Sequence, residues 1–263
     1  QVKRLCRAYR RHGAAGLVSR KRGRRSNRRI AARERRRVID LVRRRYPDFG
    51  PTLAHEYLAE QHGFAHSVET LRQWMIAAGL WQATSVRHRP IHRLRPRREA
   101  LGELIQIDGS PHAWFEARGP RCCLIVFVDD ATGLLQYAQF VPVECTRAYL
   151  QALEAYVRCH GRPLALYSDR HTIFTKHNPE DAVPTQFERA ARALGIAPIL
   201  ARSPQAKGRV ERAFQTLQDR LVKALRLAGL HGLEDANAGC PASSPITTPV
   251  SPVHPPTPST PTV

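Results

Sequence analysis

Long apolar runs are missing from this sequence of 263 residues, the longest lying near residues 122–128. A membrane-spanning helix needs about 20 mostly apolar residues in a row. A secretory signal needs an apolar stretch behind its basic start, and the early basic residues are followed by none. We therefore expect no membrane contact and a cytoplasmic location.

Cysteine is scarce, and its six residues show no C-x-x-C motif and no spacing typical of a disulfide framework. Cys122 and Cys123 fall in an apolar run, where cysteine commonly packs as a small hydrophobic residue. No His-Cys arrangement matches a zinc finger, and Pro90 between His88 and His92 argues against a helical metal pair. A glycine-rich phosphate loop is missing as well, so the sequence does not indicate use of ATP or GTP.

Acidic residues are rare in the first hundred positions, which hold 26 Lys and Arg against 7 Asp and Glu. Residues 101–263 are nearly balanced, with 16 against 15. A basic part joined to a neutral part indicates a polyanion-binding region beside a different activity, and the arginine guanidinium suits phosphate. A GC-rich genome accounts for some of the arginine but not for this asymmetry. We expect nucleic acid as the partner.

Charge disappears entirely from residues 239–263, which contain 8 prolines and no Asp, Glu, Lys or Arg. Such a segment buries too little apolar surface to offset the entropy of ordering, so we expect it to be disordered. It is either a natural flexible tail or the product of a reading frame that shifts after about residue 238; we favour the second. The chain begins with Gln1 rather than Met, and we expect it to lack its true N-terminus.

The basic region shows helical periodicity. Residues 2–12 form a short amphipathic pattern, and an Arg-dense linker at 20–29 follows. Helices are then predicted over 32–45, from a Thr52 cap to residue 63, and over 68–78 behind a Ser67 cap, with Gly79 as the stop. Three short helices with tight turns are typical of a helix-turn-helix unit, although a purely structural bundle has the same pattern. The basic segments at 20–29 and 87–98 favour DNA binding. The exposed candidates for reading bases on the last helix are Glu69, Thr70, Arg72 and Gln73.

From residue 101 the pattern changes to strands alternating with helices. Strands are predicted at 104–107, 122–128, 134–141, 164–168 and 197–200, and helices at 146–160, 186–194 and 206–228. Such an order predicts a mixed sheet with helices on both faces.

Three acids lie where a sheet could bring them together. Asp108 and Asp169 each follow a predicted strand, and Glu211 lies near the start of the long helix. Carboxylate oxygens are the ligands that Mg²⁺ prefers, and two such ions can stabilise the attacking and leaving oxygens of an in-line displacement. Each acid also has a simpler reading, as a turn residue or as a surface partner of Lys207. Asp129 and Asp130 are interpreted as a hairpin turn outside the site.

Four motifs of this region resemble the core of integrase-type DDE transposases, and two of the helical region resemble their ISNCY-type branch. The core motifs are LIQIDGS at 104–110, VDDATG at 128–133, YSDRHTIF at 167–174 and SPQAKGRVER at 203–212, and the helical motifs are FGPTLA at 49–54 and ETLRQWM at 69–75. The resemblance implies an RNase H-like α/β core with Asp108, Asp169 and Glu211 as catalytic, metal-binding residues. It implies Mg²⁺ or Mn²⁺ as cofactor, in two ions.

The resemblance also implies a reaction and partners. DNA would be hydrolysed at the element's ends, and the freed 3′-hydroxyl would attack target DNA. Lys207 and Arg209 would hold DNA phosphates near the metals. We count Arg72, Gln73, Lys207, Arg209 and Arg212 as DNA-binding residues. The partners are double-stranded transposon ends and target DNA, bound by a homo-oligomer associated with a bacterial nucleoid.

The resulting interpretation has five segments and one main alternative. Residues 1–30 are a remnant of a first helix-turn-helix with a basic linker, 31–84 a helix-turn-helix domain, 85–100 a basic linker, 101–230 the integrase catalytic core, and 231–263 a linker and Pro-rich tail. The chain would be a Mg²⁺-dependent transposase, truncated at both ends. The alternative is a catalytically defective, transposon-derived DNA-binding protein. The family pattern has Asp-Asn-Gly at the second acid where this chain has Asp169-Arg170-His171, which leaves His171 without a role.

Overall fold

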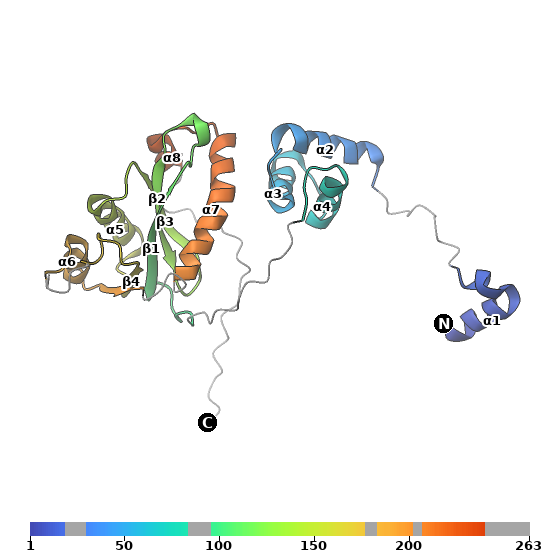
Figure 1. Ribbon diagram of the computed structural model, residues 1–263, viewed down its shortest axis with the longest axis horizontal. Helices are drawn as coiled ribbons and strands as arrows, with labels where there is room; N and C mark the ends of the chain where they lie inside the picture. The colour runs from blue at the N-terminus through green and yellow to red at the C-terminus, as the bar shows by residue number, and fades with distance from the viewer. Residues whose placement is uncertain (19–29, 84–95, 177–182, 202–206, 240–263) are drawn as a thin grey trace, which may run out of the picture. The chain divides into compact units, whose positions relative to one another are not determined.

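A computed structural model describes residues 1–18, 30–83, 96–176, 183–201 and 207–239 (Figure 1). The chain divides into two compact units, Gln1–Val86 and Arg87–Val263. The predicted basic segment at 20–29, most of the one at 87–98 and the Pro-rich tail from residue 240 lie outside the described residues.

The first unit is entirely helical. Helix α1 spans Val2–His12 and continues into the short 3₁₀ helix η1, Gly13–Leu17. Helices α2 (Ala32–Arg45), α3 (Pro51–His62) and α4 (Val68–Ala77) follow. None of the residues of α1 is buried, whereas α2 to α4 share a core of their own that includes Val42, Leu58 and Leu71. The predicted three-helix arrangement is confirmed for residues 32–77.

Local sequence sets the ends of these helices. Ser67 caps α4 as predicted, because its hydroxyl oxygen accepts a hydrogen bond from the Thr70 amide at 3.3 Å. The expected Thr52 cap of α3 is wrong: the N-cap lies two residues earlier, at Gly50, and Pro51 is the first residue of the helix. Proline suits that position because its missing N–H would have no helical partner there. Gly63 ends α3 in the left-handed conformation, at φ 64°.

The second unit is built on a five-stranded sheet with the strand order β3-β2-β1-β4-β5. Its strands are β1 (Leu104–His112), β2 (Cys122–Asp129), β3 (Leu135–Val141), β4 (Ala165–Ser168) and β5 (Ala197–Leu200). Strands β1, β2 and β3 pair antiparallel, and β4 and β5 continue the sheet in parallel from β1. The predicted mixed sheet is confirmed, but β1 is longer than expected and contains Asp108 instead of ending before it.

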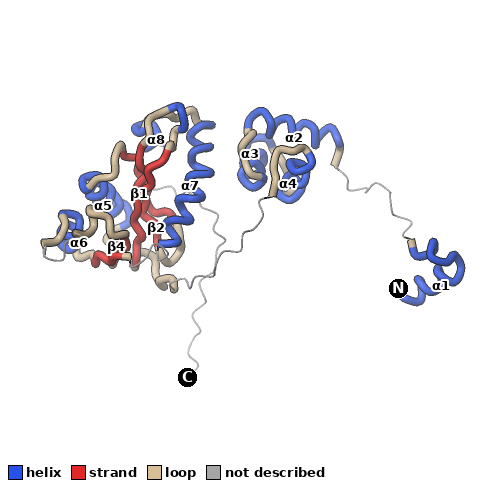
Figure 2. Tube along the Cα trace, viewed as in Figure 1, coloured by secondary structure: helices blue, strands red, loops and turns tan. Residues whose placement is uncertain are grey.

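Helices cover both faces of this sheet (Figures 1 and 2). On one face, α5 (Thr146–His160) and α6 (Gln186–Ala193) pack on Ile105, Ile107 and Ile125. On the other, α7 (Gly208–Leu227) and α8 (Leu233–Gly239) pack on Leu124, Val126 and Val128. The predicted α/β core, a mixed sheet with helices on both faces behind a separate helical unit, is confirmed.

Cys122 and Cys123 lie inside this sheet as small apolar residues, as the sequence predicted. Both are buried in β2, and burial raises the pKa of Cys122 to about 11 and that of Cys123 to about 12. Their thiols therefore stay protonated near neutral pH, and neither is a reactive thiolate. Among the described helices, none combines the length and apolar character needed to cross a membrane.

Candidate functional site

Two of the predicted acids lie at neighbouring parallel strands, Asp108 within β1 and Asp169 one residue past the end of β4. The register of β1 and β4 pairs Gln106 with Tyr167, so Asp108 and Asp169 each come two residues further along the chain. Successive side chains of a strand point to opposite faces, and Asp108 therefore shares the α7 side of β1 with Gln106 and Ser110. Ile105 and Ile107 fill the opposite side, against α5.

One ammonium group lies between the two carboxylates. Nζ of Lys207, the residue just before α7, lies 2.8 Å from Oδ1 of Asp108 and 3.4 Å from Oδ2 of Asp169. The Lys207 side chain is 7% exposed and that of Asp108 is 17% exposed, while that of Asp169 is 44% exposed. The carboxylates of Asp108 and Asp169 thus both approach one ammonium group, at a place where the Asp169 side chain remains partly exposed to solvent.

Burial makes Asp108 dependent on that positive charge. Desolvation raises the pKa of Asp108 above its usual value, and the neighbouring Asp169 carboxylate raises it further. The Lys207 ammonium and the Gly109 amide, which donates to Oδ1 at 3.1 Å, lower the same pKa. The ammonium of Lys207 therefore opposes the burial that raises the pKa of Asp108.

Gly109 allows a second polar pair to approach β1 directly behind Asp108. A Cβ atom at this position would lie 2.8 Å from the carboxylate of Glu144 and 2.9 Å from the hydroxyl of Tyr149. That hydroxyl donates to Oε1 of Glu144 at 2.7 Å. Burial and the charge of Glu144 both raise the pKa of Tyr149, so it remains a donor. Any side chain in place of Gly109 would push this pair away from the strand.

His171, which the sequence left without a role, fixes the second acid through its backbone. Its N–H donates to Oδ1 of Asp169 at 2.9 Å, while Oδ2 of the same carboxylate faces Lys207. The imidazole is exposed, and its Nδ1 accepts a 3.4 Å hydrogen bond from the Ile173 amide. The turn after β4 therefore orients the Asp169 carboxylate through the His171 amide, although Arg170 stands where the family pattern has asparagine.

Glu211 does not join the other two acids in this structure. It lies in the first turn of α7, four residues after Lys207, and its side chain is exposed. Within the part of the chain that the structure describes, no three His, Cys, Asp or Glu side chains come together as a metal-binding group. Residues four apart on a helix are neighbours, with Cβ atoms about 5–6 Å apart. The helix thus carries Glu211 beside Lys207 but not into contact with the acids of the sheet.

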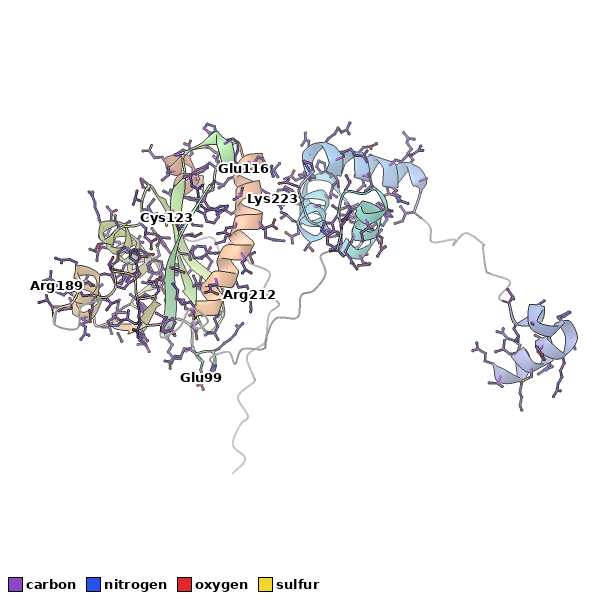
Figure 3. The ribbon with its side chains drawn as sticks, in the orientation of Figure 1. Glu99, Glu116, Cys123, Arg189, Arg212 and Lys223 are labelled. Carbon is purple, nitrogen blue, oxygen red and sulfur yellow. The ribbon has the colours of Figure 1, made fainter. Side chains whose placement is uncertain are left out.

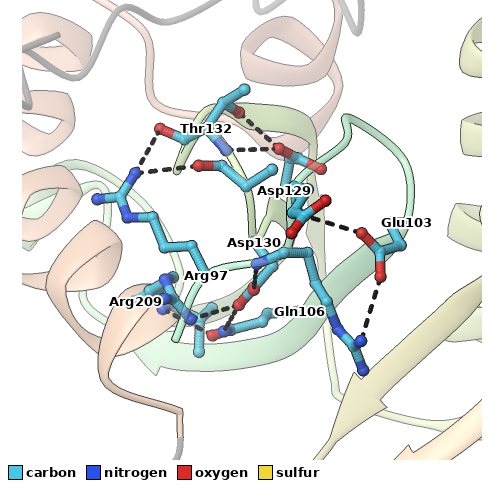
Figure 4. A network of polar contacts seen from close by, with 11 residues as sticks. Arg97, Glu103, Gln106, Asp129, Asp130, Thr132 and Arg209 are labelled. Atoms are coloured by element: carbon cyan, nitrogen blue, oxygen red, sulfur yellow. Dashed lines mark hydrogen bonds and ion pairs between the residues drawn. The ribbon is translucent and has the colours of Figure 1, made fainter. Parts of the chain in front are cut away.

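Arg209 has a partner inside the protein that the sequence analysis did not predict. Its guanidinium forms an ion pair with Asp130, whose side chain is completely buried. The hairpin-turn interpretation is incomplete for Asp130, because its side chain has partners outside the turn. Asp129 does serve the hairpin turn, accepting from the amide and hydroxyl of Thr132 at 2.8 and 2.7 Å. Asp130 instead points toward β1 and α7 (Figure 4).

The contact between Asp130 and β1 had one signal in the sequence. Gln106 is a polar residue in an otherwise apolar strand segment, and it is fully buried. A buried amide needs hydrogen-bond partners, so Gln106 in this strand predicts a polar contact inside the protein. What the sequence could not supply was the identity of those partners, which lie 24 and 104 residues away.

The predicted DNA-reading residues are exposed or half-buried on α4. Glu69 accepts from Nε and Nη2 of Arg72 at 2.8 and 2.6 Å and from Nε2 of Gln73 at 2.8 Å. The guanidinium of Arg72 also lies 6.0 Å from the ring centre of Trp81. Arg212 is exposed near the start of α7 (Figure 3). Arg72, Gln73 and Arg212 thus carry donor groups at or near the surfaces of their respective units, and in this structure those of Arg72 and Gln73 donate to Glu69.

Comparison with known sequences gives relatives of one kind. The family model described as a homeodomain-like domain matches residues 1–75. The chain is 51% identical over 244 residues to the putative transposase y4bF of Sinorhizobium fredii, covering 92% of this chain and 53% of that protein. It is 44% identical over 153 residues to the transposase for insertion sequence IS1202 of Streptococcus pneumoniae, covering 56% of this chain and 32% of that one. The chain thus spans about half or less of the length of these relatives.

Solved structures of integrase cores are similar to about half of this chain. The catalytic core domain of BIV integrase matches with 26% identity and a TM-score of 0.39, covering 51% of this chain and 78% of that one. The HTLV-2 integrase catalytic core domain in complex with magnesium matches with 20% identity and a TM-score of 0.42, covering 54% and 86%.

Proposed function

From the similarity of this chain to two transposases, we propose that it is an integrase-core transposase, which cleaves DNA at the ends of a mobile element and joins them to target DNA. The observation that supports this most directly is the convergence of Asp108 and Asp169 on one cationic group. Such a pair of carboxylates is built to hold positive charge at one point. Transposition by the whole protein, its DNA sequences and its homo-oligomeric state belong to the same proposal.

The donor set fits a hard divalent cation. Carboxylate oxygens from β1 and from the turn after β4 meet at one position, where Lys207 now supplies the positive charge, and the exposure of Asp169 leaves room for water and phosphate oxygens. These are the ligands of Mg²⁺, which keeps several waters, and Mn²⁺ accepts the same donors. Two such ions would activate a water or hydroxyl nucleophile and stabilise the oxygen that leaves the phosphorus.

The residues of this chain would orient that chemistry. The sheet holds Asp108, and the His171 amide holds one oxygen of Asp169, so both acids are placed before any ligand arrives. Lys207 would contact a DNA phosphate once a divalent cation replaces it between the carboxylates. Glu211, one turn further along the helix, would be the third acid, and Arg212 would contact the DNA backbone beside it.

The first unit would supply sequence recognition. Its α4 carries Arg72 and Gln73 on a helix that follows two others with a shared core, the arrangement in which the last helix enters the major groove. Arginine and glutamine there can form paired hydrogen bonds to guanine and adenine, respectively. The basic segments on either side would contact phosphates without regard to sequence.

A second candidate function is DNA binding without catalysis. The exposed side chain of Glu211 and the lack of a three-acid group among the described residues favour it. In that case the basic helical unit would bind terminal repeats. The ion pairs of Asp108 and Asp169 with Lys207 would then only stabilise the fold.

A cleavage assay separates the two candidates. The full chain would be incubated with duplexes carrying the element's ends and with Mg²⁺ or Mn²⁺, beside Asp169→Asn and Glu211→Gln variants. Nicks at the ends that depend on metal and on both acids would support the transposase. Binding without nicks would support the second candidate, and cleavage unaffected by Asp169→Asn would refute the assignment of the acids.

A further inference from the structure

A line of polar contacts joins β1 to α7 beneath the proposed active site. Gln106, Asp108 and Ser110 project from the same side of β1, two residues apart. Oε1 of Gln106 accepts from the Val210 amide at 3.3 Å, Asp108 pairs with Lys207 at 2.8 Å, and the hydroxyl of Ser110 accepts from Nε2 of Gln218 at 3.1 Å. Each alternate residue of the strand therefore has its own partner on the helix or immediately before it.

Asp130 is the junction of this arrangement (Figure 4). Its Oδ1 accepts from Nε2 of Gln106 at 2.8 Å and from the guanidinium of Arg209, and its Oδ2 accepts from the Arg98 amide at 2.9 Å. Its side chain is 0% exposed, and that of Arg209 is 18% exposed. One buried carboxylate thus ties together the chain before β1, the strand itself and the first turn of α7.

The position of the network in the sequence makes it relevant to the acids. Gln106 precedes Asp108 by two residues, and Arg209 lies between Lys207 and Glu211. A shift of α7 along β1 would move Lys207 and Glu211 together relative to Asp108. Metal and phosphoryl-transfer sites lose much of their activity when a group is misplaced by about 1 Å, so a fixed register of this helix has a direct chemical consequence.

We propose that Asp130, acting with Gln106, is a positioning residue of the DNA-cleaving site: it fixes the register of the start of α7 on β1, and with it the position of Lys207 beside Asp108 and the place on the helix from which Glu211 would act. The inference rests on the proposed function. It assigns Arg209 to the internal network instead of to DNA. Asp130 touches neither metal nor DNA in this assignment and acts through the helix.

The neighbouring Asp129 is a matched control, because both aspartates are fully buried in the same turn. Asp129 accepts from the amides of Gly102 and Thr132 and from the Thr132 hydroxyl, and these partners lie in the turn and before β1. Asp129→Asn and Asp130→Asn therefore remove the same charge at the same depth. In the contacts described above, Asp130 alone reaches α7.

The first measurement is hydrogen exchange of the full chain without metal or DNA. In Asp130→Asn, amides of residues 207–214 should exchange at least ~10-fold faster than in the wild type, while those of β1 and β2 change little. In Asp129→Asn, faster exchange should be confined to the turn. Gln106→Met, which keeps the side chain's length and apolar packing but removes both hydrogen bonds, is the second variant and should reproduce the effect on α7.

The second measurement is the binding of Mn²⁺ without DNA, monitored as the increase in the thermal unfolding midpoint of the chain with Mn²⁺ concentration. Loss of groups that orient metal ligands typically weakens metal binding about 10- to 100-fold, and we expect this rise in half-saturating Mn²⁺ for Asp130→Asn and Gln106→Met but not for Asp129→Asn. Equal effects of the two aspartate variants on α7 would overturn the proposal. So would faster exchange in α7 without any change in Mn²⁺ binding, because the network would then be structural.

The same experiments distinguish a failure of the transposase proposal from a failure of the positioning role. If the wild-type chain neither binds Mn²⁺ nor nicks DNA, the transposase proposal fails, and the positioning role fails with it. If the wild type binds Mn²⁺ and nicks DNA but Asp130→Asn does both equally well, the positioning role alone is refuted.

Discussion

The two units of this chain differ in how deeply some of their ion pairs are buried, although the sheet unit also has exposed pairs such as that of Arg158 and Glu154. In the helical unit the pairs lie at the surface: Arg43 and Asp40 are both 57% exposed, and Arg72 and Glu69 are 39% and 57% exposed. In the sheet unit, Lys207 and Asp108 are 7% and 17% exposed, and Arg209 and Asp130 are 18% and 0% exposed. Exposed pairs contribute about 0–1 kcal/mol each, so their cations can exchange a carboxylate for a phosphate at little cost.

Buried pairs behave differently, because removing one partner leaves an uncompensated charge in the interior. In the sheet unit, Lys207 and Arg209 therefore fix acids in place, whereas Arg43 and Arg72 of the helical unit stay at its surface. This difference agrees with the separate tasks proposed for the two units, recognition for one and chemistry for the other. Four predictions test it.

The largest effect is expected at the acids of the sheet. Asp108→Asn and Asp169→Asn should each reduce DNA cleavage at least about 1,000-fold, since losing a carboxylate that holds a catalytic metal removes several kcal/mol of transition-state stabilisation. Single-turnover nicking with Mn²⁺ measures this. DNA affinity through the helical unit should stay unchanged. Loss of DNA binding in either variant would show that the two units are not functionally separate.

The second largest effect is expected at the buried ion pair of Asp130 and Arg209. Asp130→Asn should lower the free energy of unfolding of the sheet unit by about 3 kcal/mol, because Arg209 is left without its carboxylate in a largely buried position. Hydrogen exchange in urea, read separately for β2 and α2, gives the value for each unit. A loss below about 1 kcal/mol would mean that water reaches this pair as it reaches the surface pairs.

A smaller effect is expected at the DNA-reading helix. Arg72→Ala should weaken binding to the element's end by about 1–2 kcal/mol, roughly 10-fold, and should reduce discrimination against a changed base. Arg44→Ala, an exposed cation on α2, is the matched control and should weaken binding to all sequences alike. Titrations on both DNAs at two salt concentrations measure this. Equal loss of affinity on both DNAs for Arg72→Ala would assign it to phosphate contact.

The smallest effect is expected at the exposed pair of α2. Asp40→Asn should change the free energy of unfolding of the helical unit by less than about 0.5 kcal/mol, since its partner Arg43 is solvated with or without it. Thermal unfolding of the full chain measures this. A destabilisation as large as that of Asp130→Asn would contradict the comparison between the two units.

The sequence predicted most helices and strands of the fold, because the features that mark them involve residues close together in the chain. Helices α2, α4 and α5 and strands β2 and β5 lie within one residue of their predicted ends, since caps, periodicity and apolar runs depend on neighbouring residues. The start of α3 and the length of β1 were predicted less well. Proline at Pro51 overrode the expected cap, and pairing with β2 carried β1 on through Asp108 to His112.

The candidate site was readable in part. The sequence indicated Asp108 and Asp169, and the parallel register of β1 and β4 brings them to one cation. It did not indicate that Lys207 would be that cation, nor that Arg209 would turn inward. Both follow from where α7 lies on the sheet, and the helix is separated from β1 by nearly a hundred residues of chain.

Sequence alone determined the division into a basic helical part and a neutral α/β part, because charge, periodicity and capping are properties of adjacent residues. Tertiary structure decided which charges are buried and which partner each one has. The carboxylates at 129 and 130 show the reason: they are chemically identical neighbours, yet one serves its own turn and the other reaches α7. Their difference arises from strand pairing and helix packing, which no local pattern encodes.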